Sequence, residues 1–132
     1  MSGQGKRIGC VIVAHGNVGQ CLMEAVQGIL GKQANWVAVS NAGMGLGDLN
    51  EAVRSAVASL ASECEVVVIS DMPGGSCHHV CQEMVAGSAG TRALTGVNLM
   101  MLLEFFVKRD RTEVDELIQT VKERGRDAVR IL

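Results

Sequence analysis

The sequence of 132 residues has few aromatic residues, almost no proline and no long apolar run. It contains no Tyr, one Trp, two Phe and one Pro. Its longest apolar runs, such as residues 9–14, are far shorter than the ~20 residues that a helix needs to cross a bilayer. The polar, basic start MSGQGKR lacks the apolar segment of a signal peptide. We therefore expect no membrane-spanning helix and a cytoplasmic location.

The sequence also lacks an excess of charge. Twelve basic and 14 acidic side chains give a net charge of −2, which offers no electrostatic reason to bind nucleic acid or an anionic membrane. The cysteines are odd in number and stand in apolar contexts, which is typical of free thiols in a reducing compartment. They are Cys10, Cys21, Cys64, Cys77 and Cys81. The length predicts one domain, residues 1–132, with a single sizeable core.

What the sequence does contain is a regular alternation of predicted strands and helices. Residues 8–14 (IGCVIVA) and 65–70 (EVVVIS) are nearly continuous apolar runs, as expected for strands buried on both faces of a parallel sheet. Shorter strands are predicted at 36–40 and 91–95. Such alternation predicts βαβ units, and hence an α/β fold with a mostly parallel sheet.

The helices are predicted from apolar spacing and capping residues. The first covers 18–30 and ends at Gly31, and the second begins at Asp48 as its N-cap. A third begins near Ser76. Asn98 is expected to cap a helix over 99–107, and Thr112 to begin the last one. The tail, residues 128–132, is interpreted as a short edge strand or an arm.

Two strand-to-helix junctions hold the candidate site, because ligands of open α/β sheets bind beyond the carboxyl ends of the strands. One junction reads Ala14-His15-Gly16-Asn17, and the other Asp71-Met72-Pro73-Gly74-Gly75-Ser76. If strands 8–14 and 65–70 are neighbours, as in the flavodoxin-like order, His15 and Asp71 face each other. The carboxylate would then fix the imidazole tautomer and leave the other ring nitrogen as a nucleophile. From spacing alone, an ordinary loop histidine remains an alternative.

The second junction also predicts an anion site. Backbone N–H groups of Gly74, Gly75 and Ser76 would lie at the positive end of a helix, where a phosphoryl group binds readily. The Ser76 hydroxyl would add a further donor. A histidine beside such a loop predicts phosphoryl chemistry on His15.

At these residues the sequence resembles the EIIA domain of the mannose (mannose/fructose/sorbose) family of the phosphoenolpyruvate-dependent sugar phosphotransferase system (PTS). The motifs that carry the resemblance are IVAHG, SDMPGGS, TGVNLMMLLE and GRDAVRIL, which together cover essentially the whole chain. The resemblance implies a phosphotransferase of sugar transport in which His15 takes a phosphoryl group from the phosphocarrier HPr and passes it to a histidine of an EIIB partner. By the same resemblance Asp71 orients His15, and the phosphate-binding residues are Gly16, Gly74, Gly75 and Ser76.

The resemblance further implies an architecture and an assembly. The expected fold is an α/β sandwich of three layers with a parallel sheet of about four strands and helices on both faces. The family's usual homodimer is formed by an exchanged C-terminal strand. No cofactor is expected, and contact with a membrane is expected only indirectly, through a transporter complex.

The sequence departs from the family pattern at two places. Cys77 stands where the family usually has proline after the loop serine, and Met100 replaces proline in the GVN motif. Neither change removes a proposed chemical group. Both are expected to alter the rim of the site, where Met44, Met72, Met100 and Met101 are candidates for an adaptable docking surface, with core filling as the alternative for Met101.

Three alternatives stay open at this point. Related domains donate phosphoryl groups to a dihydroxyacetone kinase, and a regulator without a dedicated transporter would use the same chemistry. A third reading is a small-molecule or metal-binding module using Cys77, His78, His79 and Cys81. A structural zinc site needs four converging ligands, and no second ligand pair exists, so no metal is expected there. The absence of a P-loop motif gives no support for direct use of ATP.

Overall fold

The computed structural model describes residues 7–132 and contains a four-stranded, all-parallel sheet in the order β2-β1-β3-β4. The strands are β1 (Arg7–Ala14), β2 (Trp36–Ser40), β3 (Cys64–Ser70) and β4 (Thr91–Thr95). This is the flavodoxin-like order, which confirms the predicted fold class and makes β1 and β3 neighbours.

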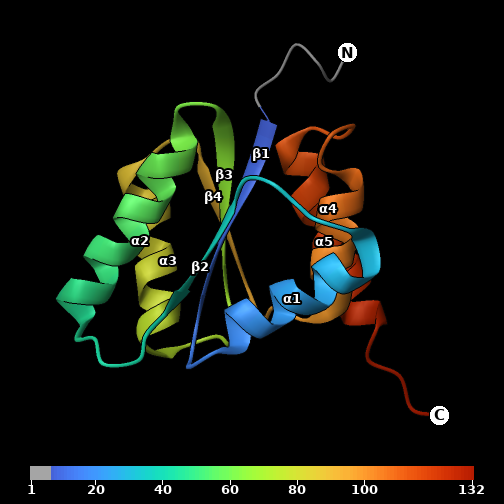
Figure 1. Cartoon of the computed structure of the whole chain (residues 1–132), viewed down its shortest axis with the longest axis horizontal. Helices are drawn as coiled ribbons and strands as arrows, with labels where there is room; N and C mark the ends of the chain where they lie inside the picture. The colour runs from blue at the N-terminus through green and yellow to red at the C-terminus, as the bar shows by residue number, and fades with distance from the viewer. Residues whose placement is uncertain (1–6) are drawn as a thin grey trace.

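The helices lie on both faces of the sheet and make three layers (Figure 1). They are α1 (Val18–Leu30), α2 (Leu46–Ala61), α3 (Gly75–Gly87), α4 (Leu99–Lys108) and α5 (Val114–Asp127). In Figure 1 the sheet is seen nearly edge-on, with α2 and α3 on one side and α1, α4 and α5 on the other. No helix among residues 7–132 is long and apolar enough to cross a membrane.

The two central strands are buried on both faces, which explains their continuous apolar sequences. In β1, Ile12 packs toward the layer of α1, α4 and α5, where Phe105 and Leu117 are fully buried. The next residue, Val13, packs toward α2 and α3 together with Val53. Alternate residues of one strand therefore supply two separate cores, one on each side of the sheet.

Two predicted helix starts are wrong, that of α2 by three residues and that of α5 by one. Helix α2 begins at Leu46 with Gly45 as its N-cap, so Asp48 lies inside its first turn rather than before it. Helix α5 begins at Val114 with Glu113 as its N-cap, so Thr112 precedes the cap. Neither actual cap makes a side-chain hydrogen bond, and the backbone at Gly45 and Glu113 is extended. The helices therefore begin without the side-chain acceptors that the sequence analysis relied on.

The C-terminal tail leaves the body of the protein after α5 and forms no strand in the described sheet. Figure 1 shows it extending away from the other elements. Val129, Ile131 and Leu132 are exposed. Of the two predicted forms of the tail, the paired edge strand is wrong for the single chain, and the arm agrees with the structure.

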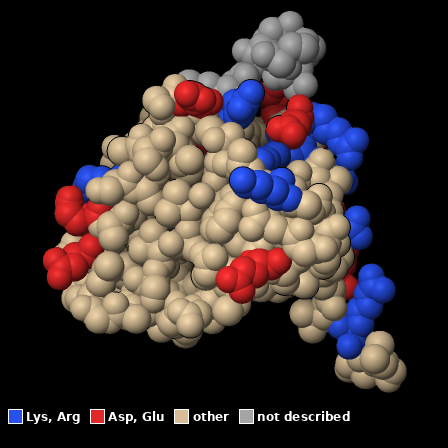
Figure 2. Space-filling view, viewed as in Figure 1, with Lys and Arg blue, Asp and Glu red and all other residues tan. Residues whose placement is uncertain are grey.

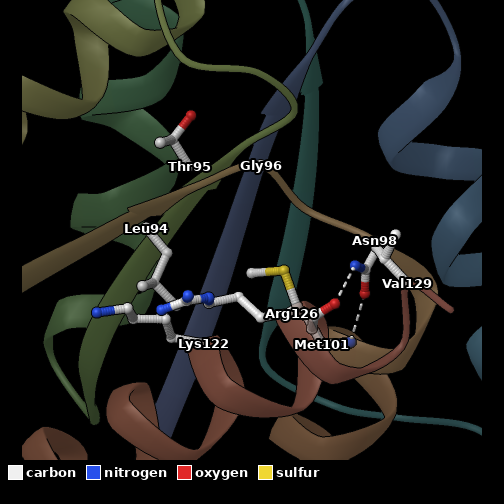
Figure 3. Close-up of a pocket in the computed structure, with 9 residues that line it drawn as sticks. Leu94, Thr95, Gly96, Asn98, Met101, Lys122, Arg126 and Val129 are labelled. Atoms are coloured by element: carbon white, nitrogen blue, oxygen red, sulfur yellow. Dashed lines mark hydrogen bonds between the residues drawn. The ribbon is translucent and has the colours of Figure 1, made fainter.

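A pocket of about 250 Å³ lies beside β4, the sheet's edge strand, close to where the tail begins. Figure 3 shows residues from three segments meeting there: Leu94 of β4, Met101 of α4 and Arg126 of α5. Val129, the second residue after α5, also contributes to the lining. The edge strand β4 and the start of the tail therefore line the same pocket.

Candidate active site

His15 and Asp71 emerge side by side from the two central strands. Val13 of β1 is opposite Ser70 of β3, and each chain then runs off the carboxyl edge of the sheet. The order of the strands reverses between β1 and β3, which is where ligands of doubly wound sheets bind. The predicted pair therefore lies at the topological switch point, at the lower edge of the view in Figure 1.

One carboxylate oxygen of Asp71 is hydrogen-bonded to both the ring and the main chain of His15. Oδ2 lies 2.8 Å from Nδ1 of the ring and accepts the backbone N–H of His15 at 2.9 Å. An ionised carboxylate only accepts hydrogen bonds, so Nδ1 carries the proton and Nε2 keeps its lone pair. The His15 side chain is 46% exposed and that of Asp71 only 14%. The arrangement presents Nε2 as a nucleophile.

The pKa of Asp71 is lower than usual. Burial alone would raise it, but the hydrogen bonds from the backbone N–H and ring of His15 and the charge of that ring outweigh burial. The carboxylate is therefore ionised at neutral pH, in the form that accepts the Nδ1 proton.

The glycine-rich loop leads directly into α3. Gly74 and Gly75 have φ angles of 87° and 79°, a left-handed conformation that residues with a Cβ rarely adopt. Helix α3 begins at Gly75, with Gly74 as an N-cap that supplies no side-chain acceptor. The first amide groups of α3 have no such capping partner, as an anion site requires. The phosphate-binding role of Gly74, Gly75 and Ser76 remains a prediction.

Gly16 is held by a hydrogen bond to a neighbouring loop, and its phosphate-binding role also remains a prediction. Its φ angle is 54°, and its N–H donates to Oδ1 of Asn41 at 3.3 Å. Asn41 follows β2 at the same edge of the sheet, and its own N–H donates to the carbonyl of Ala14. Asn41 was not among the predicted site residues, although the strand-end rule that selected His15 also applies to it. Asn41 fixes the turn that carries His15.

Cys77 does not contribute to the rim of the site. It was expected to shape the rim, but it is completely buried. A donor atom of each of His15, Asp71 and Cys77 lies within 4.8 Å of those of the other two. Cys77 and Cys81 both pack in the core between the sheet and α2 and α3, where a thiol behaves as a small apolar side chain. The inward position of Cys77 follows from α3 beginning at Gly75, which no local sequence signal specifies.

The rim of the site is apolar and nearly uncharged. The four loops that follow the strands, residues 15–17, 41–45, 71–74 and 96–98, contain one acidic residue, Asp71, and no Lys or Arg. Figure 2 shows an uncharged surface along most of the lower edge of the molecule in this view. The exposed apolar side chains at this end are Val18, Met44, Leu46, Met72 and Met100. The exposure of Met44, Met72 and Met100 fits the predicted docking surface, whereas Met101 is buried in the core.

These features define a doubly wound α/β protein with an exposed histidine, paired with a carboxylate, at its switch point. Residues 9–122 match the family described as "PTS system fructose IIA component". The chain belongs to this family, the mannose/fructose type of PTS EIIA components, whose members are in general phosphotransferases.

Individual relatives agree with this assignment. The PTS system fructose-specific EIIA component of Bacillus subtilis is 28% identical over 87% of this chain and 80% of its own length. The mannose-specific EIIAB component of Escherichia coli K12 is 30% identical over 95% of this chain, which spans only 39% of that protein. The crystal structure of a PTS EIIA component from Streptococcus agalactiae superposes with a TM-score of 0.86 at 28% identity, over 94% of this chain and 96% of that one.

Proposed function

We propose that this protein carries a phosphoryl group on Nε2 of His15, accepting it from phospho-HPr and passing it to a histidine of an EIIB partner. The observation that carries the proposal is the double hydrogen bond of His15 to Oδ2 of Asp71. It fixes the tautomer in which Nε2 is the free nitrogen, on a side chain that a protein partner can reach.

The transfer uses groups already in place. The lone pair of Nε2 attacks phosphorus, an N–P bond forms, and the bond to the donor nitrogen breaks with its electron pair returning to the donor. The imidazole gains positive charge, which the ionised Asp71 stabilises through Nδ1–H. Amide groups at the start of α3, from Gly74, Gly75 and Ser76, receive the phosphoryl oxygens. Transfer to EIIB reverses the same steps with a new acceptor nitrogen.

The surface around His15 is suited to direct transfer of a phosphoryl group between two proteins. A phosphoryl group moves directly between two protein side chains only when both surfaces approach closely and exclude water. The apolar residues around the site, which include Val18, Met44 and Met72, are suited to such a contact. A cytoplasmic location and a single EIIA domain over residues 1–132 belong to the same proposal.

We further propose that the protein forms a homodimer through its tail and the edge of its sheet. β4 ends the described sheet and pairs only with β3. An open edge strand is a template for pairing with another chain. The exposed apolar tail begins beside the pocket that adjoins β4. Covering this edge with a second subunit's tail would bury both.

The function is tested by incubating the protein with enzyme I, HPr and phosphoenolpyruvate, with Mg²⁺ present, and mapping any phosphohistidine. We expect one labelled residue, His15, with the phosphoryl group on Nε2. The His15→Ala variant should take up no label, and the double variant His78→Ala, His79→Ala should be labelled normally. Label that persists in His15→Ala would overturn the proposal. Subsequent loss of label on adding an EIIB protein tests the second transfer.

A further inference from the structure

The neighbourhood of His15 contains a third potential ligand that the proposed phosphoryl chemistry does not use. Cys77 lies on the buried face of α3, and its Sγ is within 4.8 Å of donor atoms of both His15 and Asp71. The three side chains come from the end of β1, the end of β3 and the first turn of α3. In the sequence the potential ligands next to Cys77 are His78, His79 and Cys81, whereas the fold brings it to ligands from two other elements.

One atom of this cluster lacks a partner. Oδ1 of Asp71 is buried and has no hydrogen bond within the part of the chain that the structure describes. The other oxygen, Oδ2, already accepts two hydrogen bonds from His15. A buried carboxylate oxygen without a donor is costly, and a bound cation removes that cost. The unpartnered oxygen therefore points to a positively charged ligand at this position.

We propose that His15, Asp71 and Cys77 form a binding site for a thiophilic divalent metal ion of the zinc type, open to solvent on the side of His15. Imidazole nitrogen, carboxylate oxygen and thiolate sulfur are the three donor types that zinc takes from proteins. Three protein ligands with a fourth position for water are the pattern of zinc sites that are not purely structural.

The geometry requires only side-chain adjustments. Donor atoms of a tetrahedral zinc site lie roughly 3.3–3.8 Å apart, given bonds of about 2.0–2.3 Å. The present donors are within 4.8 Å of one another, so the longest separation must shorten by about 1 Å. The 2.8 Å between Nδ1 and Oδ2 is a hydrogen-bond distance, so a metal that uses Nδ1 replaces the proton there. The displaced proton passes through solvent to Nε2, and the Cys77 thiol releases its proton to solvent.

The site has a consequence that rests on the proposed phosphoryl function. A metal on Nε2 occupies the nucleophile directly. A metal on Nδ1 moves the ring proton to Nε2, where it occupies the lone pair that would attack phosphorus. In either case metal binding and phosphorylation of His15 exclude each other, so the metal ion would act as an inhibitor of the carrier.

The metal site is tested by titrating the reduced, chelator-treated full-length protein with Co²⁺ as a spectroscopic substitute for Zn²⁺. We expect one ion per chain, with a thiolate-to-cobalt charge-transfer band and the visible bands of four-coordinate cobalt; added Zn²⁺ should abolish both. Cys77→Ser should lose the charge-transfer band. The matched control Cys81→Ser, a buried cysteine one turn further along α3, should retain it.

A second variant guards against misfolding of Cys77→Ser. The half-exposed His15 can be replaced by Ala with little effect on the core. His15→Ala should weaken Co²⁺ binding by more than about tenfold, because even the loss of a residue that only hydrogen-bonds to a metal ligand weakens binding by about that factor. Absence of the charge-transfer band in the wild type, or an unchanged band in Cys77→Ser, would overturn the metal site. The titration contains no phosphoryl donor, so its result is independent of the labelling experiment. If both succeed, the phosphorylated protein should bind no Co²⁺.

Discussion

At the scale of single residues, the hydrogen bonds of Asp71 are what would make His15 a nucleophile in the proposed transfer. The side chain after β3 is short and its carboxylate meets the first residue after β1 because the two strands are paired in parallel. The same Oδ2 accepts from the ring and from the main chain of His15. A longer acid at position 71 would place its oxygens differently and lose one of the two bonds.

The first residue-scale prediction concerns Asp71→Asn. The amide keeps the size of the side chain but removes the negative charge that supports the imidazole. We expect phosphoryl transfer to fall by roughly 10²- to 10⁴-fold. The free energy of unfolding should fall by no more than about 1.5 kcal/mol, the usual contribution of a hydrogen bond. Rapid-quench transfer assays and urea unfolding measure the two effects, and a transfer rate close to that of the wild type would assign Asp71 a structural role only.

A second residue-scale prediction concerns pH. Burial raises the pKa of the Cys10 thiol to about 12. Burial is also the main reason why the pKa of the Cys81 thiol is raised to about 12. These thiols stay protonated in the folded chain while they ionise in the unfolded chain above about pH 9. Their contribution to stability is therefore complete below the ordinary thiol pKa and is lost as the pH rises through this window, by about 1.4 kcal/mol per pH unit per thiol.

Urea unfolding at a series of alkaline pH values, with reductant present, checks this expectation. Cys10→Ala should be less stable at neutral pH because it leaves a cavity, but its stability should decline less steeply with pH than that of the wild type. The exposed Cys21 provides the matched control, and Cys21→Ala should reproduce the slope of the wild type. Equal slopes in all three proteins would show that Cys10 ionises in the folded state.

At the scale of elements, Asn98 joins the start of α4 to the end of α5. Its Oδ1 accepts the N–H of Met101, and its Nδ2 donates to the carbonyl of Gly125, both at 3.0 Å. A Cβ at position 125 would collide with the Met101 side chain, so glycine allows the two helices to approach. Figure 3 shows both hydrogen bonds beside the pocket.

Asn98→Ala should therefore cost more than an ordinary helix cap. Loss of the cap costs about 0.5–2 kcal/mol, and loss of the bond to Gly125 about 1 kcal/mol more. Asn98→Ser, which keeps a capping oxygen, should lose only the second contribution. The comparison by urea unfolding separates the two bonds, and equal losses in the two variants would mean that the cap adds nothing to stability.

The sequence predicted which strands and helices form more accurately than the residues at which they begin. Apolar runs such as residues 65–70 identify buried strands because both faces must be covered, and Asn98 was recognised because its cap is a local interaction. Asp48 and Thr112 are good capping residues, but the actual helices begin at Leu46 and Val114 with caps that use no side-chain acceptor. A capping residue permits a helix start, whereas packing on the sheet decides where the helix begins.

The pairing of His15 with Asp71 could be predicted from the sequence, but the position of Cys77 could not. Strand ends meet at one edge of a parallel sheet, so His15 and Asp71 could be paired once the strand order was assumed. The burial of Cys77 depends on the rotation of α3 about its axis, which the packing of the whole helix determines. The sequence around Cys77 does not contain that information.

At the scale of the whole molecule, the proposed dimer gives a prediction about the tail. Deleting residues 128–132 should convert the dimer into monomer or aggregate, because β4 then lacks the segment that covers its edge. Light scattering at micromolar concentration measures the mass. Ile131→Asp is a milder variant: its side chain is fully exposed in the single chain, so the folded subunit should be unaffected while association is lost. A monomer mass for the intact protein would disprove the dimer.

The uncharged rim around His15 has a further consequence for how partners find this site. Long-range attraction between opposite charges can raise association rates far above the roughly 10⁵–10⁶ M⁻¹s⁻¹ of neutral surfaces, and salt then slows the encounter. The four loops here contain no Lys or Arg and only one acid, and the chain's net charge is −2. We therefore expect association at the His15 site to be little steered by charge and to depend little on ionic strength. Partner choice would then depend on the fit of apolar surfaces after collision.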